Sequence, residues 1–401
     1  MKAANPCTVL ARIRGVRGSA LIAGALFAVA VHAAPFVPAE DSQILERLPT
    51  RTTPQFRELK ALREAARQHP GDVSAASALA LAYVRTSRVE GDPRFLGYAQ
   101  AALAPWWKDA QAPTSVLVLR ATILQSSHQF DAALVSLATV LAREPGNAQA
   151  RLTRATVLTV QGRYAAARED CGSLAGAVPT VYRVICLAAI DSVTGRSARA
   201  YAALQYALQY STHVDDSARM WGQTLLGEIA HRQGDPDAEK HFRAALGVGD
   251  RDAYLLGAYA DWLLDQRRDA EVVALLQGET RVDTLLLRLA LAQQALRAPE
   301  GPASIALLAA RFDASHARGD TVHARENARF ELALRNDANA ALSYALESWK
   351  VQREPADLWI LAASANASGD SAALDTVRTW MTQSGIEHPQ VAAMLAPKAK
   401  P

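Results

Sequence analysis

The sequence has none of the short motifs that carry the common enzyme chemistries. It contains no glycine-rich phosphate loop, no Gly-x-Ser-x-Gly nucleophile elbow and no paired-cysteine metal knuckle. Its histidines include the pairs His231 with His241 and His316 with His323, and neither pair has the i, i+4 spacing of a helical zinc site. We therefore expect no catalytic residue, no cofactor and no metal.

Aromatic residues are also few, at 6% of the chain, whereas 50% of the residues are hydrophobic and alanine is abundant. This composition is typical of close-packed helices with ample burial and not of a disordered tail. No stretch sustains a two-residue alternation of apolar and polar residues, which argues against a sheet.

A charge excess of one sign is missing as well. The chain has 43 Lys and Arg against 40 Asp and Glu. Four of the basic residues fall within the first 33, so removal of that segment leaves 39 against 40 and a net charge of −1. Composition therefore implies no basic face for nucleic acid or for an anionic membrane.

Only one long apolar run is present, from Ala20 to Val31, and basic residues without any acid precede it. These features predict a signal peptide over residues 1–33, with cleavage after Ala33 because small residues precede that bond. The alternative is a retained membrane anchor, but an apolar core of roughly a dozen residues is short for a bilayer that needs about 20. Cys7 precedes the run, so a lipoprotein anchor is not supported. We expect an exported, periplasmic bacterial protein without a membrane anchor of its own.

What the chain does have is an internal repeat over 113–179. The tripeptide Arg-Ala-Thr at 120–122 returns unchanged at 154–156, and an aromatic residue, an alanine pair and a proline recur at the same offset. Two helices cross closely only where side chains are small, which suits Ala121 and Ala155 to the crossing points.

This pattern resembles the tetratricopeptide repeat, a helix–turn–helix unit of about 34 residues that stacks into a solenoid. The resemblance implies an all-α fold, an α-α superhelix of stacked helical hairpins, in which Gly162 permits the reversal between two helices. It also implies a protein or peptide partner, held along the concave groove that the first helices line.

The resemblance divides the chain into four parts. Residues 1–33 are the signal peptide, 34–54 an extended lead-in, 55–277 the repeat solenoid, and 278–401 degenerate repeats with a C-terminal cap. In the last part, helical periodicity predicts helices near 282–297, 303–318, 322–335, 338–352, 357–368 and 371–384.

Three local features add detail to this division. The extra residues over 85–93 imply a longer loop, and Ala258 and Ala270 mark a fifth unit. Trp106 and Trp107 have two interpretations: they form an exposed recognition corner, or they fill the junction between two units.

Cys171 and Cys186 lie on helices that are adjacent in a stacked repeat. In an oxidising periplasm they are candidates for a disulfide; the alternative is two buried free cysteines. Arg120 and Arg154 share one repeat position, where we expect each stem to pack and each guanidinium to pair with a nearby acid.

Carrying the family's groove positions onto this chain gives ten partner-groove candidates in two units. They are Ser115, Val118, Thr122, Gln125 and Ser126, then Gln149, Leu152, Thr156, Thr159 and Val160. The lining is neutral, which suits an extended segment held by apolar contacts and hydrogen bonds to its backbone. The subfamily that clamps a C-terminal carboxylate has lysine and asparagine at positions where this chain has Val118 and Thr122, so that clamp is not expected.

The sequence thus favours a non-enzymatic periplasmic scaffold that binds a protein or peptide, and no nucleic acid. Two alternatives remain open: an envelope-assembly accessory docked on a membrane partner, and an enzyme whose site lies in the helical region 278–401.

Overall fold

The computed structural model describes Glu40 and residues 53–249, 252–319 and 322–396. Apart from Glu40, these residues belong to one compact unit, Thr52–Pro401. The signal peptide predicted over 1–33, its cleavage site and nearly all of the lead-in 34–54 lie outside the described residues, so these remain predictions.

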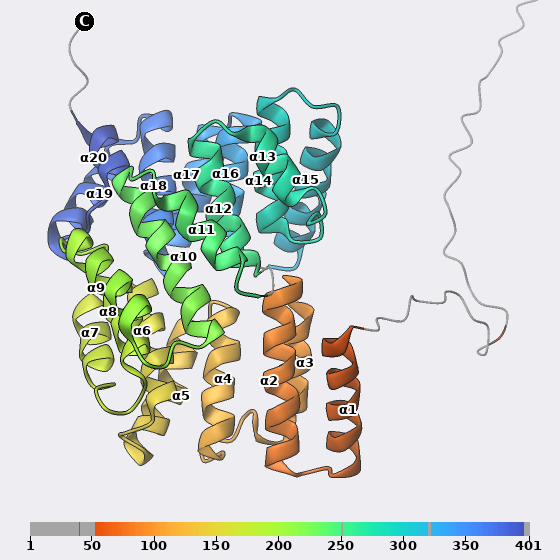
Figure 1. Ribbon diagram of the computed structural model, residues 1–401. Coiled ribbons are helices and arrows are strands. Elements are labelled where there is room, and N and C mark those ends of the chain that lie inside the picture. Colours follow the sequence, from red (N-terminus) through yellow and green to blue (C-terminus); the bar gives the residue numbers. More distant parts are fainter. Residues whose placement is uncertain (1–39, 41–52, 250–251, 320–321, 397–401) are drawn as a thin grey trace, which may run out of the picture. The chain divides into compact units, whose positions relative to one another are not determined.

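The described part of the chain is helical throughout and contains no strand, which confirms the all-α prediction (Figure 1). Its first ten helices are α1 (Pro54–Gln68), α2 (Val73–Glu90), α3 (Arg94–Ala102), α4 (Thr114–Ser126), α5 (Phe130–Arg143), α6 (Ala148–Val160), α7 (Tyr164–Gly172), α8 (Thr180–Asp191), α9 (Ser197–Tyr210) and α10 (Asp216–Gln233). The other ten are α11 (Ala238–Leu246), α12 (Ala253–Asp265), α13 (Asp269–Leu276), α14 (Asp283–Ala295), α15 (Gly301–Ala317), α16 (Ala324–Phe330), α17 (Ala338–Val351), α18 (Pro355–Ser368), α19 (Ser371–Ser384) and α20 (Pro389–Leu395). A short 3-10 helix, η1 (Ala104–Trp106), follows α3, and a π-helical segment, η2 (Glu331–Arg335), continues α16.

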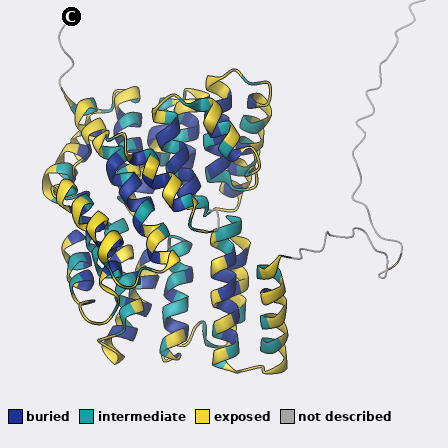
Figure 2. Ribbon diagram, viewed as in Figure 1, coloured by how far each residue is buried: buried dark blue, intermediate teal, exposed yellow. Residues whose placement is uncertain are grey.

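Consecutive helices from α2 to α19 pack as pairs, α2 with α3, α4 with α5 and so on to α18 with α19. We call the earlier helix of each pair its first helix and the later one its second helix. First helices of neighbouring pairs also contact one another, and α1 packs on α2 as a cap. Buried residues form a stripe along these helices (Figure 2). Within the described residues, no helix is both long and apolar enough to cross a bilayer.

Short-range chemistry sets the helix ends. The side chains of Asn147, Asp215 and Asp370 each accept a hydrogen bond from a backbone N–H in the first turn of the helix that follows, at 2.8–2.9 Å. Between α6 and α7 the chain reverses at Gly162, whose φ of 72° is left-handed. The reversal expected at this glycine is therefore present.

The loop expected over 85–93 is wrong. The helix α2 continues to Glu90 and ends only at Gly91, whose φ is 60°. No glycine or proline lies between Val73 and Glu90, and the hydroxyl of Thr86 is buried and donates to the carbonyl oxygen of Ala82. The extra residues therefore lengthen a helix.

The positions expected for the buried small residues of the fifth unit are wrong by two residues. Ala260 and Val272 are fully buried at the crossing of α12 and α13, whereas Ala258 is only half-buried and Ala270 is exposed. In this pair the left-handed residue of the turn is Arg267, so no glycine marks the turn in the sequence.

Trp106 and Trp107 are both half-buried and pack against the core that includes Leu103 and Leu117. The backbone carbonyl of Trp107 accepts a hydrogen bond from Arg120 at 2.9 Å. The two tryptophans therefore fill the junction between the α2/α3 and α4/α5 pairs.

The two arginines of the repeated tripeptide differ in their partners. Arg154 makes a two-point ion pair with the buried carboxylate of Asp170, with both N–O distances 2.6 Å, as expected. Arg120 donates instead to the hydroxyl of Ser136, which occupies the repeat position that Asp170 has in the next unit. The expectation of an acid partner is therefore wrong for Arg120, because its unit has serine at that position.

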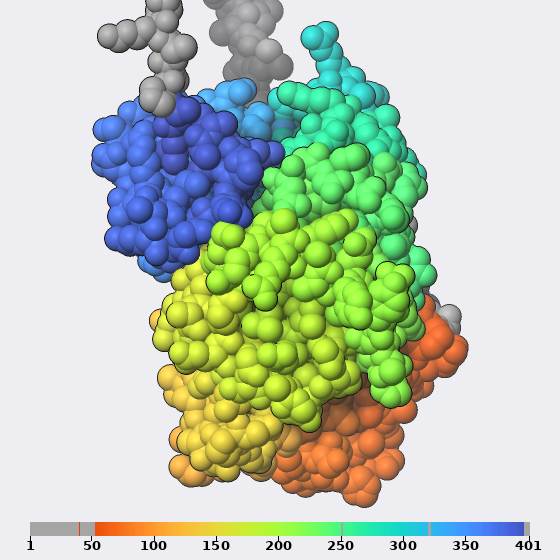
Figure 3. Space-filling view, turned by 60° about the vertical axis from the view of Figure 1, so that its left-hand side comes forward, coloured from red at the N-terminus to blue at the C-terminus, as the bar shows by residue number. Residues whose placement is uncertain are grey.

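The C-terminal helices pack against earlier pairs, and Figure 3 shows the blue C-terminal part of the chain in contact with the yellow and green parts. The N–H of Arg353 donates to the carbonyl oxygen of Val160 at 2.7 Å, and the N–H of Glu387 donates to that of Val193 at 2.9 Å. One hydrophobic core includes side chains from α6 to α8 and from α16 to α20. Elements that are distant in the sequence are therefore held together by a shared core.

Candidate functional site

One backbone feature gives the helix pairs a common register: a residue of positive φ between the first and the second helix. These turn residues are His128, Gly162, Gly195, Gly234, Arg267 and Arg297, with φ between 55° and 78°. They span the pairs from α4/α5 to α14/α15. Two residues of different first helices are therefore equivalent when they stand the same number of residues before the turn residue of their own pair.

The ten predicted groove residues fill five equivalent positions, because each stands at the same distance before its turn residue in both pairs. We number these groove positions in chain order, so that Ser115 and Gln149 hold the first, and Thr122 and Thr156 the third. Ser115, Gln149 and Thr156 are exposed, and the other seven candidates are half-buried. Four hydroxyls already donate to the carbonyl of the preceding helical turn, at 2.7–3.0 Å: those of Thr122, Ser126, Thr156 and Thr159. Toward a partner these hydroxyls can therefore serve as acceptors.

The first groove position becomes aromatic in the next three pairs. Tyr182, Trp221 and Tyr254 stand there on α8, α10 and α12, where the earlier pairs have Ser115 and Gln149. We call these three residues the aromatic row. Tyr254 exposes 63% of its surface and Trp221 exposes 37%, while Tyr182 is half-buried. Three consecutive first helices thus present an aromatic side chain at one equivalent position.

Carboxylates hold the two tyrosines of the row. The hydroxyl of Tyr182 donates to both oxygens of Asp215 at 2.8 and 2.9 Å, and that of Tyr254 donates to Glu228 at 2.6 Å. Burial and the bond to Asp215 raise the pKa of Tyr182 to about 12. The negative charge of Glu228 raises the pKa of Tyr254 well above its ordinary value. Both hydroxyls therefore stay protonated and remain bound to their acids.

The acids at the third groove position, Glu228 on α10 and Asp261 on α12, also have partners within the chain. Asp261 accepts from Arg288 at 2.5 Å and from Arg329 at 2.6 Å. Burial acts to raise the pKa of Asp261, but the two guanidinium charges outweigh it and lower the pKa to about 2. Glu228 precedes Arg232 by one helical turn, and its pKa is raised by burial. These carboxylates therefore bind arginines and a tyrosine and are not left as isolated charges.

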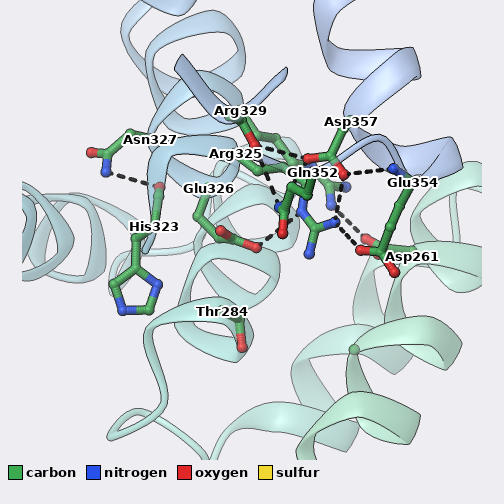
Figure 4. A network of polar contacts seen from close by, with 12 residues as sticks. Asp261, Thr284, His323, Arg325, Glu326, Asn327, Arg329, Gln352, Glu354 and Asp357 are labelled. Carbon is green, nitrogen blue, oxygen red and sulfur yellow. Dashed lines mark hydrogen bonds and ion pairs between the residues drawn. The ribbon is translucent and has the colours of Figure 1, made fainter. Parts of the chain in front are cut away.

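A buried carboxylate joins α16, α17 and α18 (Figure 4). Asp357 is fully buried and accepts from Ser348 at 2.9 Å, from Gln352 at 3.0 Å and from the backbone N–H of Glu354 at 3.0 Å. Arg325 bonds to Glu354 at 2.8 Å and approaches Asp357 at 3.4 Å. Burial raises the pKa of Asp357. Both of its oxygens are engaged, so this network holds three helices together.

The histidines contribute to packing. His241 is buried between the hydroxyl of Tyr201 and the side-chain amide of Gln223, each at 2.7 Å. His231 pairs with Asp265 at 2.9 Å, and His316 stacks on Tyr344. No group of three His, Cys, Asp or Glu within the described ranges could hold a metal ion.

Cys171 on α7 and Cys186 on α8 form a disulfide in the structure, with their Cα atoms 5.7 Å apart. Both side chains are buried. The bond links the second helix of one pair to the first helix of the next.

The sequence reasoning named no groove residue beyond α6 and so missed Trp221, Glu228 and Tyr254 on this face. A signal was present, because each occupies a position equivalent to one of the ten candidates. It was hard to use because the repeat spacing drifts: the turn residues Gly195 and Gly234 are farther apart in the sequence than His128 and Gly162 are.

Comparison with known proteins agrees with this organisation for part of the chain. A family model described as Tetratricopeptide repeat matches residues 124–171, which run from α4 to α7. This stretch of the chain is thus similar to a tetratricopeptide repeat. No curated protein matches the chain.

Three solved structures are similar at low identity. The APC/C hetero-tetramer Cut9–Hcn1 has 13% identity and a TM-score of 0.38, covering 77% of this chain and 52% of that one. A tetratricopeptide repeat protein from Parabacteroides merdae ATCC 43184 has 14% identity and a TM-score of 0.35, covering 77% and 99%. The Naa15/Naa10 complex bound to HypK-THB has 18% identity and a TM-score of 0.28, covering 82% and 56%. The chain thus spans about half of the first and third structures, 52% and 56% of their lengths.

Proposed function

We propose that this chain is an exported scaffold protein of the bacterial periplasm, and that it binds a segment of a partner protein on the face of its first helices. Stacked helical pairs present long continuous surfaces and are widely used for protein binding. The tetratricopeptide repeat match over 124–171 supports this class of function.

The observation that carries the proposal is the aromatic row. Aromatic side chains bury a large area on binding and are enriched among the residues that dominate interface energies. Tyr254 leaves 63% of its surface exposed while Glu228 fixes its hydroxyl. A rigidly held, exposed ring loses little conformational entropy when a partner covers it.

Export is supported by two features of different kinds. Residues 1–33 have the charge and apolar pattern of a signal peptide. The disulfide between Cys171 and Cys186 belongs to the kind of bond that persists in oxidising compartments. Cell fractionation followed by N-terminal sequencing tests this proposal, and we expect periplasmic protein that starts at Ala34; a cytoplasmic protein with residues 1–33 attached contradicts it.

Photo-crosslinking in the native compartment tests binding. A photoreactive phenylalanine in place of Tyr254 should capture a discrete partner, whereas the same group in place of Tyr206, which is 66% exposed on α9, should not. Equal capture at both positions, or none at 254, argues against binding on this face.

Bulky substitutions test the two units that the sequence singled out. Thr122→Trp and Thr156→Trp are expected to weaken capture of that partner without unfolding the chain, because they fill the first-helix face with side chains that carry no charge. Circular dichroism checks the fold. Unchanged capture by both variants would place the contact beyond α4 and α6.

The envelope-assembly alternative makes a different prediction for fractionation. An accessory docked on a membrane partner should pellet with membranes only when that partner is present. The enzyme alternative for 278–401 has less support, because Asp357, the most deeply buried of the acids described in that region, is saturated by hydrogen bonds from its own helices.

A further inference from the structure

We propose that the segment 386–390, which we call the strap, is a built-in competitor of the partner. It crosses the fifth groove positions of α8, α10 and α12, and a partner segment can lie on that part of the first-helix face only after displacing it. This inference rests on the proposed function and adds to it how access to the face is controlled. Three observations carry it: the path of the strap, its backbone conformation and the unpaired polar atoms beneath it.

The strap meets three consecutive first helices at one equivalent position. The fifth groove position stands two residues before the turn residue, and Val193, Arg232 and Asp265 hold it on α8, α10 and α12. The carbonyl of Val193 accepts from the N–H of Glu387 at 2.9 Å. The carboxylate of Asp265 accepts from the side-chain amide of Gln390 at 3.2 Å. The two ends of the strap are therefore bonded to α8 and α12.

His388 lies between these two contacts in the sequence and faces α10. Its side chain is only 7% exposed. Burial, and then the positive charge of Arg232, lower the pKa of His388 to about 4, so the imidazole lies within the field of that guanidinium. The order of residues along the strap thus follows the order of the first helices.

The strap is held in the way that proteins hold extended peptides. The backbone of His388 is extended, with φ −144° and ψ 91°. Ile386 and His388 are buried, whereas Glu387 between them is exposed. Carbonyls in the last turn of a helix have no partner within that helix, and the N–H of Glu387 satisfies one of them. Apolar contacts and main-chain hydrogen bonds are also the interactions that we expect for a partner segment in the groove.

The same acceptor is used on α6. The carbonyl of Val160, one of the ten groove candidates, accepts from the N–H of Arg353 at 2.7 Å. Val160 and Val193 hold equivalent positions on their helices. Main-chain donors from the C-terminal part of the chain therefore occupy the fifth groove position twice, once on a helix of the predicted groove.

The junction beneath the strap is incompletely hydrogen-bonded. Four buried polar atoms have no partner among the described residues: the hydroxyl of Tyr164, Nε of Arg232, Nε1 of Trp380 and Nδ1 of His388. Tyr164 and Trp380 pack in the same core as Ile386 of the strap. A buried polar group without a partner costs free energy that it recovers in water. Exchange of the strap for a partner that fills the site of Ile386 is therefore easier than the burial of the strap alone suggests.

Hydrogen exchange in the mature protein tests whether the strap opens. We expect the amide of Glu387 to exchange faster than the amides of α8 and α10, because the strap opens without unfolding the first helices. Gln390→Ala removes the bond to Asp265 and should speed this exchange about fivefold, the effect of one hydrogen bond. Gln383→Ala, at an exposed position of α19, is the matched control and should not change the rate. Exchange at Glu387 that is no faster than in α10 overturns the inference.

Peptide binding tests whether the vacated surface accepts an extended segment. The probe is a labelled peptide with the sequence of residues 384–392, followed by fluorescence anisotropy. The wild type should bind it weakly, because the tethered strap competes at a high effective concentration.

Two variants with a loosened strap should bind this peptide more tightly. Glu387→Pro removes the N–H that bonds to Val193 and should gain about tenfold in affinity. Circular dichroism checks its fold, and Gln390→Ala, a milder change at an exposed site, should gain about fivefold. Equal affinity of the wild type and Gln390→Ala, or no binding to any of the three proteins, overturns the inference.

Photo-capture links the strap to the proposed function. With the photoreactive group at position 254, Gln390→Ala should capture about fivefold more partner than Gln383→Ala does. Equal capture by the two leaves the proposed binding face intact and shows that the strap is not a competitor. If neither protein captures a partner, the proposed function and the competitor role both fail.

Discussion

Small residues decide how closely the helices of each pair can approach. In every pair that has a turn residue of positive φ, from α4/α5 to α14/α15, the residue immediately before the third groove position is alanine or glycine. These residues are Ala121, Ala155, Ala188, Gly227, Ala260 and Ala290. All are buried. Gly227 departs from alanine for a local reason, because the ring of Phe242 on α11 lies 2.7 Å from the point where a Cβ would stand. The aromatic side chain of the second helix thus takes the room that a methyl group has in the other pairs.

Gly227→Ala is therefore expected to destabilise the protein, because the new methyl group forces Phe242 to shift. Overpacking of this kind costs about 1–3 kcal/mol. Thermal unfolding measures it as a lower midpoint. The matched control is Gly146→Ala, where no atom lies within 4 Å of the added Cβ and the change should stay within about 0.5 kcal/mol. Equal midpoints for the two variants would show that Phe242 adjusts without cost.

At the scale of helices, contacts between neighbouring pairs hold the stack together. Each second helix from α3 to α13 also packs on the first helix of the next pair. Between α7 and α8 this contact is covalent, through Cys171 and Cys186. The helix α7 is short, with nine residues, and buries only four of them. A cross-link therefore supports a junction with little packed surface of its own.

Removing this bond is expected to lower stability. The two cysteines are 15 residues apart in the sequence, and a loop of that length corresponds to about 3 kcal/mol in the chain-entropy description of disulfides. Thermal unfolding of the Cys171→Ser/Cys186→Ser double variant measures the loss. Thiol titration of the unreduced mature protein is the direct check: we expect no free thiol, and two free thiols would end the assignment.

At the scale of the whole compact unit, the C-terminal segment rests on the turns of several earlier pairs. Gln390 bonds to Asp265 at 3.2 Å, and Trp380 lies so close to Gly162 that a Cβ there would meet its ring at 2.3 Å. His388 is buried in the same region, with only 7% of its surface exposed. Burial, and then the positive charge of Arg232, lower the pKa of His388 to about 4.

This low pKa predicts that acid weakens the contact. The ordinary value for histidine is 6.5, so between pH 6.5 and about 4 the unfolded chain binds a proton that the folded chain does not. The contribution of His388 to the free energy of unfolding is therefore complete above pH 6.5 and falls as the pH is lowered to 4. A pKa difference of this size corresponds to about 3 kcal/mol.

The measurement is the thermal midpoint as a function of pH. The wild type should lose stability between pH 6.5 and 4, and His388→Gln should lose distinctly less over the same window, since glutamine does not titrate. His213→Gln, at an exposed position, is the control and should follow the wild type. Parallel curves for His388→Gln and the wild type would exclude His388 as the source.

The helices and their pairing follow from the sequence, because apolar periodicity, capping residues and turn glycines all act within a few residues. The helix predicted over 371–384 is α19, Ser371–Ser384, and the one predicted over 338–352 is α17, Ala338–Val351. The contacts of Arg120 and Arg154 were predictable only in part, since the partner residue is Ser136 in one unit and Asp170 in the next. The ten groove candidates belong to two helix pairs, α4/α5 and α6/α7. The aromatic row occupies the equivalent of their first groove position in the next three pairs.

The tertiary structure alone decided which distant elements meet. The contacts of Arg353 with Val160, Glu387 with Val193 and Gln390 with Asp265 join residues that are far apart in the sequence. No period in the sequence encodes such contacts, because they depend on the small rotations that accumulate from pair to pair along a stack. Local chemistry therefore determined the repeating unit, and the summed geometry of many units determined where the C-terminal segment comes to rest and which aromatic side chains stay exposed.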